Sequence, residues 1–237
     1  MHCGAPVSDL FYRIGQDIRL RQCSCGEVAD HYIEFEILLV FIDMQLLRRE
    51  VYRHVLFNRF SRETLSREAW RFFLLCLILD TYTCWSQLKS IPDAKSVVSD
   101  WLRQEHGDWA VLAVTVLETA TYLLCVSFVA LLVSPSVSIF SRRAHFRIWE
   151  AVLVSSFGKV YTLVGLVWGH LGGFSDNLGG LGPAGPGPAM VIALALFVAA
   201  SNIMAVEAVL EDSDCRGAAL AVALANVVRI GLRSFLQ

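Results

Sequence analysis

The chain has 237 residues, of which 55% are hydrophobic and only 18% are charged. Soluble domains average about 45–50% apolar and about 25% charged residues, so this composition argues against a disordered or purely water-soluble chain. The formal net charge of -2 at pH 7 excludes a surface built throughout for nucleic acid, because phosphate binding needs a dense basic face.

Residues 1–71 are about as long as a small domain. A domain of this size often requires a bound metal ion or another cross-link for stability. Three cysteines in this region are candidate zinc ligands: Cys3, Cys23 and Cys25. Structural zinc usually takes four Cys or His ligands, commonly from two C-x2-C pairs. The first cysteine reads as the second half of a pair that would begin before Met1, and C-S-C-G at 23–26 is one residue short. The pattern predicts a zinc site completed by His2 or His31, a site that this chain has lost, or a start that lies upstream.

Residues 37–58 place apolar side chains at the helical spacing of three and four, with arginines between them. The apolar positions are Ile37, Val40, Phe41, Met44, Leu47, Val51 and Val55. One interpretation is a helix packed on its own domain. The other is an interfacial helix whose apolar face enters the headgroup boundary while its arginines contact anionic phosphate. The nearby first membrane span favours the interfacial helix.

Long apolar runs dominate the rest of the chain. A bilayer core of about 30 Å requires about 20 helical residues, and three runs are long enough: 110–133, 148–171 and 190–210. The run at 72–88 is shorter and carries Asp80, and an additional candidate at 217–235 is interrupted by Asn226 and Arg229. Core helices of a soluble protein are disfavoured, because too little polar sequence remains to cover them. The sequence predicts an all-α multi-pass membrane protein with four or five transmembrane helices.

Basic residues in the short loops predict the orientation. Arginines crowd the stretch before the first span, and three more lie between the second and third spans, at Arg142, Arg143 and Arg147. Both regions are expected on the cytosolic side, which places the N-terminal region in the cytosol. The C-terminus is cytosolic with four spans and on the opposite side with five.

Ionisable residues within spans are functional candidates, because an unpaired charge in hydrocarbon costs at least about 2.5–3.5 kcal/mol. They are Asp80, Glu118, Lys159 and Glu207. No recognisable nucleophile–base pair or metal cluster accompanies them, so no catalytic residue is predicted. A further interpretation pairs Glu118 with Lys159 on neighbouring helices, where the pair holds the bundle together or lines an ion path.

Two sequence blocks resemble the homology domain of the Arv family (ACAT-related protein required for viability). They are C-G-E-V-A-D-H-Y-I-E-F at 25–35 and V-Y-R-H-V-L-F-N at 51–58. The family pattern has two C-x2-C pairs, a D-K-Y-I-E-Y block and a Y-R-H-L-L-F-N block. S-S-F-G-K at 155–159 is also similar to the family. The resemblance implies a homology domain over residues 1–60, a degenerate zinc ribbon plus an amphipathic segment, and a transmembrane region over 61–237.

The resemblance also implies a function. Arv-family proteins are multi-pass proteins of the endoplasmic reticulum with a small, cytosolic, zinc-ribbon-like β-containing domain at the N-terminus. They act without catalysis in intracellular lipid homeostasis: sterol transport and distribution, sphingolipid metabolism and delivery of glycosylphosphatidylinositol intermediates. The expected partners are therefore membrane lipids and not nucleic acid, and the alternative is a membrane-embedded lipid-modifying enzyme. Only Cys3 and Cys25 match the family's ligand positions directly, and Cys23 is displaced.

Overall fold

The computed structural model of the chain describes residues 3, 5, 7–34, 36–59, 67–90, 107–134, 141–162, 164, 188–210 and 215–236. The N-terminal part begins with the strands β1 (Phe11–Ile14) and β2 (Asp17–Leu20). Short helical elements follow: η1 (His31–Ile33), α1 (Ile37–Gln45), α2 (Arg49–Arg53) and the π-helix η2 (His54–Arg59). The long helices are α3 (Arg67–Ser90), α5 (Gly107–Val133), α6 (Arg142–Ser155), α8 (Pro188–Leu210) and α9 (Cys215–Leu236), and the 3-10 helix η3 (Ser156–Val160) extends α6.

A small β region begins the chain. Strands β1 and β2 pair antiparallel from Phe11↔Leu20 to Ile14↔Asp17, which leaves a two-residue turn. Gly15 opens this turn with φ of 64°, a conformation that glycine adopts without strain. An isolated bridge between Gln22 and Val28 then closes the loop that carries two of the cysteines. This hairpin and loop agree with the expected β-containing N-terminal domain.

The predicted single helix over 37–58 is wrong, because the chain turns sharply between α1 and α2. Leu47 has φ of 56°, and the amides of Leu47 and Arg48 donate to the carbonyls of Met44 and Asp43. These two bonds are those of a Schellman motif, which ends an α-helix with a left-handed residue. Because the motif redirects the chain, α1 and α2 present different faces to the rest of the protein.

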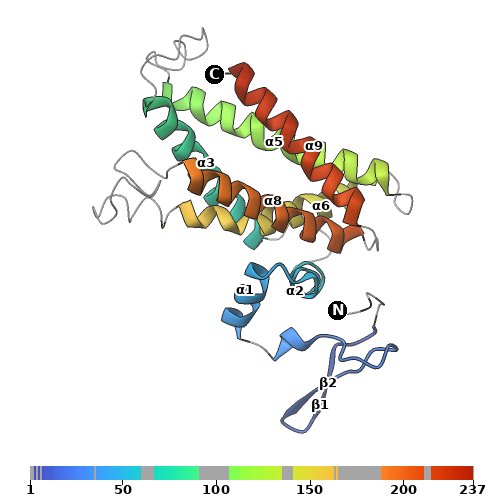
Figure 1. Ribbon diagram of the computed structural model, residues 1–237. Helices are drawn as coiled ribbons and strands as arrows, with labels where there is room; N and C mark the ends of the chain where they lie inside the picture. The colour runs from blue at the N-terminus through green and yellow to red at the C-terminus, as the bar shows by residue number, and fades with distance from the viewer. Residues whose placement is uncertain are drawn as a thin grey trace.

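The long helices form a bundle, and α1 and α2 lie against one side of it (Figure 1). Helix α5 packs along α9, and α6 packs along α8. Alanines at one face of α9, at 218, 221 and 225, are almost completely buried against Val126 and Leu131 of α5 and Val206 of α8. Small side chains let helix backbones approach closely, which is a common basis of packing between membrane helices.

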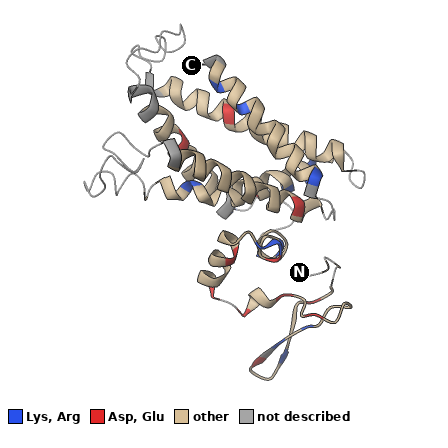
Figure 2. Cartoon of the chain, in the orientation of Figure 1, with Lys and Arg blue, Asp and Glu red and all other residues tan. Residues whose placement is uncertain are grey.

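In the part of the chain that the structure describes, three helices are long and apolar enough to cross a membrane: Trp109–Val133, Met190–Leu210 and Arg216–Ser234. Charged residues are sparse along these helices (Figure 2). The predicted spans at 110–133 and 190–210 and the additional candidate at 217–235 therefore coincide with membrane-length helices. The segment 72–88 lies within the continuous helix α3, which is not one of these three.

The described part of the predicted span over 148–171 is not one uninterrupted α-helix. Helix α6 ends at Ser155, and residues 156–160 form the 3-10 helix η3. The hydroxyl of Ser156 donates to the carbonyl of Val152, four residues earlier, at 2.7 Å. Such back-bonding bends helices. Residues 163 and 165–171 lie outside the described part of the chain, as does the predicted domain boundary at 60–61.

Replacing Gly158 with Ala is expected to lower the free energy of unfolding by about 1–3 kcal/mol. A Cβ at Gly158 would lie 2.7 Å from Cδ1 of Phe197 and 3.0 Å from Cγ2 of Val198. Gly231 is the matched control, because a Cβ there meets nothing within 4 Å and Ala favours a helix by about 1 kcal/mol. Thermal unfolding of the purified variants in detergent measures the difference. Equal midpoints for the two variants would contradict the close packing of η3 on α8.

Candidate functional site

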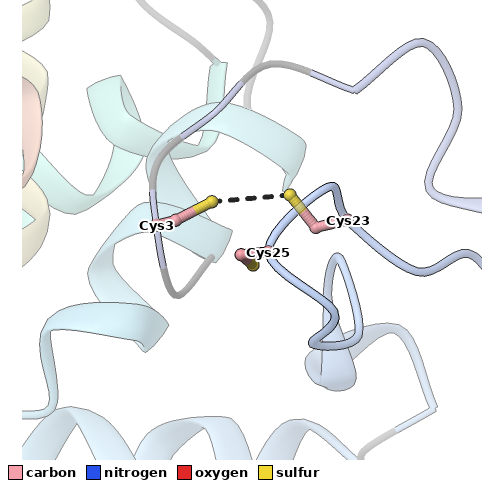
Figure 3. A group of neighbouring side chains, drawn as sticks. All are labelled: Cys3, Cys23 and Cys25. Carbon is pink, nitrogen blue, oxygen red and sulfur yellow. Dashed lines mark hydrogen bonds between the residues drawn. The ribbon is translucent and has the colours of Figure 1, made fainter.

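The three cysteines of the N-terminal region lie together (Figure 3). Their sulfur atoms are all within 4.8 Å of one another, and Sγ of Cys3 is 3.4 Å from Sγ of Cys23. Cys23 and Cys25 come from the loop after β2, and Cys3 approaches them from the start of the chain. Among the described residues the group contains no histidine, so His31 is not part of it, and His2 lies outside the described part.

The three sulfur atoms lie close enough together to bind one metal ion. A hydrogen bond from the backbone of Cys25 and one from the side chain of Cys3 lower the pKa of Cys23 to about 6. A backbone hydrogen bond at Glu27 lowers the pKa of Cys25, but the side chains of Cys3 and Cys23 outweigh it and raise the pKa of Cys25. The thiolate is the form that binds metal ions, and zinc prefers sulfur ligands in a tetrahedral arrangement. The cluster therefore offers three of the four ligands that a structural zinc ion takes.

A buried carboxylate joins the two sequence blocks at 25–35 and 51–58. Asp30 is fully buried, and its Oδ1 accepts a hydrogen bond from the amide of Tyr32 at 3.0 Å. Its Oδ2 lies 2.6 Å from Nδ1 of His54 and also accepts a bond from the amide group of Asn58. Burial raises the pKa of Asp30, but the hydrogen bonds from His54 and Asn58 outweigh it and hold the pKa below its usual value. Asp30 thus ties the cysteine loop to the π-helix η2.

The segment that follows Asp30 is docked on the bundle. The hydroxyl of Tyr52 is 2.7 Å from Oγ of Ser201 on α8, and Nη1 of Arg49 is 3.0 Å from Oε1 of Glu207 at the end of the same helix. Nη1 of Arg147 on α6 donates to the carbonyl of Leu56 at 3.0 Å. The homology segment and the membrane helices therefore form one connected unit.

This docking corrects the interfacial interpretation of residues 37–58. Arg49 pairs with Glu207, and Arg53 is only 8% exposed, so these arginines face protein and not lipid phosphate. Val51 and Tyr52 are buried against the bundle. Helix α1 and its C-cap do keep the exposed apolar face expected of an interfacial helix, with Ile37, Leu38, Leu39, Phe41, Ile42 and Leu46.

The charged residues within the bundle pair across helices. Nζ of Lys159 is 2.6 Å from Oδ2 of Asp80, and Nη2 of Arg229 is 3.8 Å from the same oxygen. Glu118 receives Nε of Arg229 at 3.7 Å and Nε of Arg233 at 3.6 Å. The predicted pair of Glu118 with Lys159 is therefore wrong, since each has another partner. The sequence offers one indication of the partners of Glu118. The apolar run at 217–235 contains two arginines four residues apart, which a helix places on the same face.

A polar cavity lies beside these charges. It has a volume of about 60 Å³ and lies among α3, α5, α6, η3, α8 and α9. Its polar wall includes Asp80, Tyr122, Lys159, Asn202, Asn226 and Arg229. The amide nitrogen of Asn202 donates to the hydroxyl of Tyr122 at 2.9 Å, and the amide oxygen of Asn202 accepts from Ser155 at 2.6 Å. The hydrogen-bonded side chains of Ser155, Asn202 and Tyr122 thus form a polar cluster inside an otherwise apolar bundle.

Comparison with known proteins identifies relatives of the chain. The Arv1-like family matches residues 1–175. The chain is 25% identical over 226 residues to the protein arv1 homolog of Dictyostelium discoideum, a match that covers 90% of this chain and 85% of that protein. It is 35% identical over 173 residues to protein ARV 1 of Arabidopsis thaliana, covering 70% of this chain and 66% of that protein.

A further relative is protein ARV1 of Homo sapiens, 26% identical over 174 residues, with 72% of this chain and 62% of that protein covered. The chain thus spans less than two thirds of the human relative and about two thirds of the Arabidopsis one. No solved structure matches the chain. Because the family match extends from the cysteine cluster through the bundle segment S-S-F-G-K, the chain belongs to the Arv1-like family.

Proposed function

We propose that this protein acts without catalysis in intracellular lipid homeostasis, as a multi-pass protein of the endoplasmic reticulum with its N-terminal region in the cytosol. The lipids that it distributes are sterols, sphingolipids or glycosylphosphatidylinositol intermediates. Membership in the Arv1-like family carries this proposal. The membrane-length helices and the exposed apolar face of α1 support a site of action in the bilayer.

The pairing of the intramembrane charges supports a binding role over a catalytic one. Asp80, Glu118, Lys159 and Glu207 each have a partner of opposite charge on another element. A charge held in such a pair stabilises the bundle, whereas a general acid or base must be available to a substrate. The arrangement therefore favours a protein that holds or moves lipid.

Expression of the chain in cells deleted for their own Arv1-like protein tests the proposal. The fraction of labelled sterol that reaches the plasma membrane and the levels of labelled ceramide are measured with and without the chain. Restoration of the normal distribution is expected, with the chain located in the endoplasmic reticulum. A tag on the N-terminus should be digested by protease added to intact microsomes. Normal expression without any change in lipid distribution would contradict the proposal.

We also propose that Cys3, Cys23 and Cys25 bind a zinc ion with a fourth ligand from outside the cluster. Elemental analysis of the purified full chain is expected to find about one zinc per chain. The double substitution Cys23→Ser and Cys25→Ser should abolish it, while Cys84→Ser, on α3, should leave it unchanged. A wild-type chain without zinc, or equal zinc in the double variant, would refute the site.

A further inference from the structure

The charges around the bundle cavity do not balance. Of the residues that line the cavity, Lys159 and Arg229 contribute two positive charges and Asp80 contributes one negative charge. Glu118, which contacts Arg229 from outside the lining, is shared with Arg233. One positive charge is therefore left uncompensated within this group. An excess charge is expensive inside a membrane protein, so a group of this kind favours an anionic ligand.

Hydrogen-bond donors at the cavity also lack acceptors. The contact between Lys159 and Asp80, at 2.6 Å, is short enough for a hydrogen bond, but Arg229 lies 3.7 and 3.8 Å from its two carboxylates. Among the described residues, no hydrogen bond from the Arg229 guanidinium is present. The hydroxyl of Tyr122 accepts from Asn202 and also interacts with the side chain of Asn226. The cavity wall thus places guanidinium and ammonium donors beside a tyrosine hydroxyl.

The size and position of the cavity fit the phosphate of an amphiphile. About 10–15 Å³ of such space holds one water molecule, so about 60 Å³ accommodates a group of several non-hydrogen atoms. Phe73, Leu77 and Leu123 line the same cavity and offer an apolar wall. Arg229 lies five residues before the end of the membrane-length segment Arg216–Ser234, which is about 8 Å along the helix at 1.5 Å per residue. A position near the end of such a segment suits a group that binds a headgroup phosphate beside an apolar wall.

We propose that this cavity binds the phosphate group of a membrane phospholipid. Arg229, Lys159 and Tyr122 donate to the phosphate oxygens, and the acyl chains lie along Phe73 and Leu77. A guanidinium matches phosphate geometry and forms strong charge-assisted bonds, whereas a neutral hydroxyl headgroup would leave the excess charge in place. Of the lipids in the proposed function, glycosylphosphatidylinositol intermediates carry such a phosphate. The inference rests on the proposed function and deepens it by assigning a phosphate-bearing class of lipid and its binding site.

Photolabelling of the purified full chain in dodecyl maltoside tests the site. The probes are a photoactivatable phosphatidic acid and a diacylglycerol with the same acyl chains, which lacks the phosphate. Phosphatidic acid is expected to label the wild type much more strongly. Arg229→Gln should lower that labelling about tenfold, as loss of a charged hydrogen bond does. Arg233→Gln is the matched control, because Arg233 contacts Glu118 at a similar distance but does not line the cavity.

Two further variants guard against misfolding of Arg229→Gln. Arg229→Lys keeps the charge and should retain part of the labelling, and Tyr122→Phe should reduce it severalfold at unchanged charge. Equal labelling by the two probes, or equal losses in Arg229→Gln and Arg233→Gln, would overturn the inference. Displacement by millimolar inorganic phosphate as effective as by phosphatidic acid would assign the cavity to free phosphate and also overturn it.

Labelling and the restoration of lipid distribution in cells are scored separately. A wild-type chain that restores the distribution but shows no phosphate-dependent labelling overturns the cavity assignment alone. A chain that labels as expected but restores nothing supports the cavity assignment and overturns the proposed function.

Discussion

Replacement of Asp30 by Ala is expected to destabilise the protein by about 3–5 kcal/mol, the cost of removing one partner from a buried charged network. The change leaves His54, Asn58 and the amide of Tyr32 without the acceptor that all three share. Because this carboxylate connects the cysteine loop to η2, the N-terminal region should also loosen from the bundle. Denaturant unfolding of the full chain in detergent, with limited proteolysis of the N-terminal region, measures both effects.

Asp9→Ala is the control for this prediction. Asp9 also pairs with a basic residue, Arg21, but its side chain is 64% exposed. Exposed ion pairs contribute about 0–1 kcal/mol, so the control should unfold almost as the wild type does. Because folding lowers the pKa of Asp30, the stability from its ionised form is present above its usual pKa and is lost as the pH falls through the folded value. A small and equal effect of both substitutions would show that the Asp30 network does not hold the two blocks together.

Replacement of Asp80 by Ala is expected to cost more stability than replacement of Lys159 by Ala. Without Asp80, both Lys159 and Arg229 lose a carboxylate, whereas without Lys159 the carboxylate still has Arg229 at 3.8 Å. Asp80→Ala leaves Lys159 without its carboxylate and should cost about 3–5 kcal/mol. Lys159→Ala should cost less, because Asp80 keeps its contact with Arg229. Thermal unfolding of both single variants and of the double variant in detergent provides the measurement.

The double variant Asp80→Ala and Lys159→Ala should be less destabilised than the sum of the single variants by about 1–3 kcal/mol, because it removes both charges together. The pair Arg21 and Asp9 at the surface offers a control cycle with an expected coupling near zero. Additive losses at Asp80 and Lys159, or a greater loss at Lys159, would contradict the assigned pairing.

The membrane helices could be predicted because the length of an uninterrupted apolar run can be compared directly with the thickness of a bilayer. The segments 110–133 and 190–210 needed only a count of residues. The run at 217–235 was the weakest candidate because Arg229 interrupts it, yet it forms one of the membrane-length helices. Arg229 is tolerated there because Glu118 and Asp80 approach it from other helices, which a pattern along one segment does not show.

Two local features could not be predicted because their residues are not the usual ones. The turn after α1 places Leu47 in a left-handed conformation that is normally taken by glycine, so the sequence carries no stop signal there. The change to a 3-10 helix at Ser156 accompanies a hydrogen bond from the hydroxyl of Ser156 to the carbonyl of Val152 in the same helix. Both features redirect elements that periodicity alone extends as continuous helices.

The contacts between sequence blocks that lie far apart in the chain could not be predicted either. The blocks that contain Asp30 and His54 are recognisable by resemblance, but nothing in their spacing shows that these two side chains meet. The cysteines were predicted together from their chemistry, and the structure places them together. Glu207 was predicted as an intramembrane charge, and its partner Arg49 lies in a segment predicted to face lipid.

The central claim is that the homology segment, docked on the membrane helices, acts with them as one unit in lipid homeostasis. A charge exchange between Arg49 and Glu207, whose side chains are 3.0 Å apart, tests it directly. Lipid distribution is measured in cells that lack their own Arv1-like protein and express Arg49→Glu, Glu207→Arg or both. Each single change should impair restoration, and the double change should recover most of it. A double variant as impaired as the worse single variant, at equal expression, would contradict the claim.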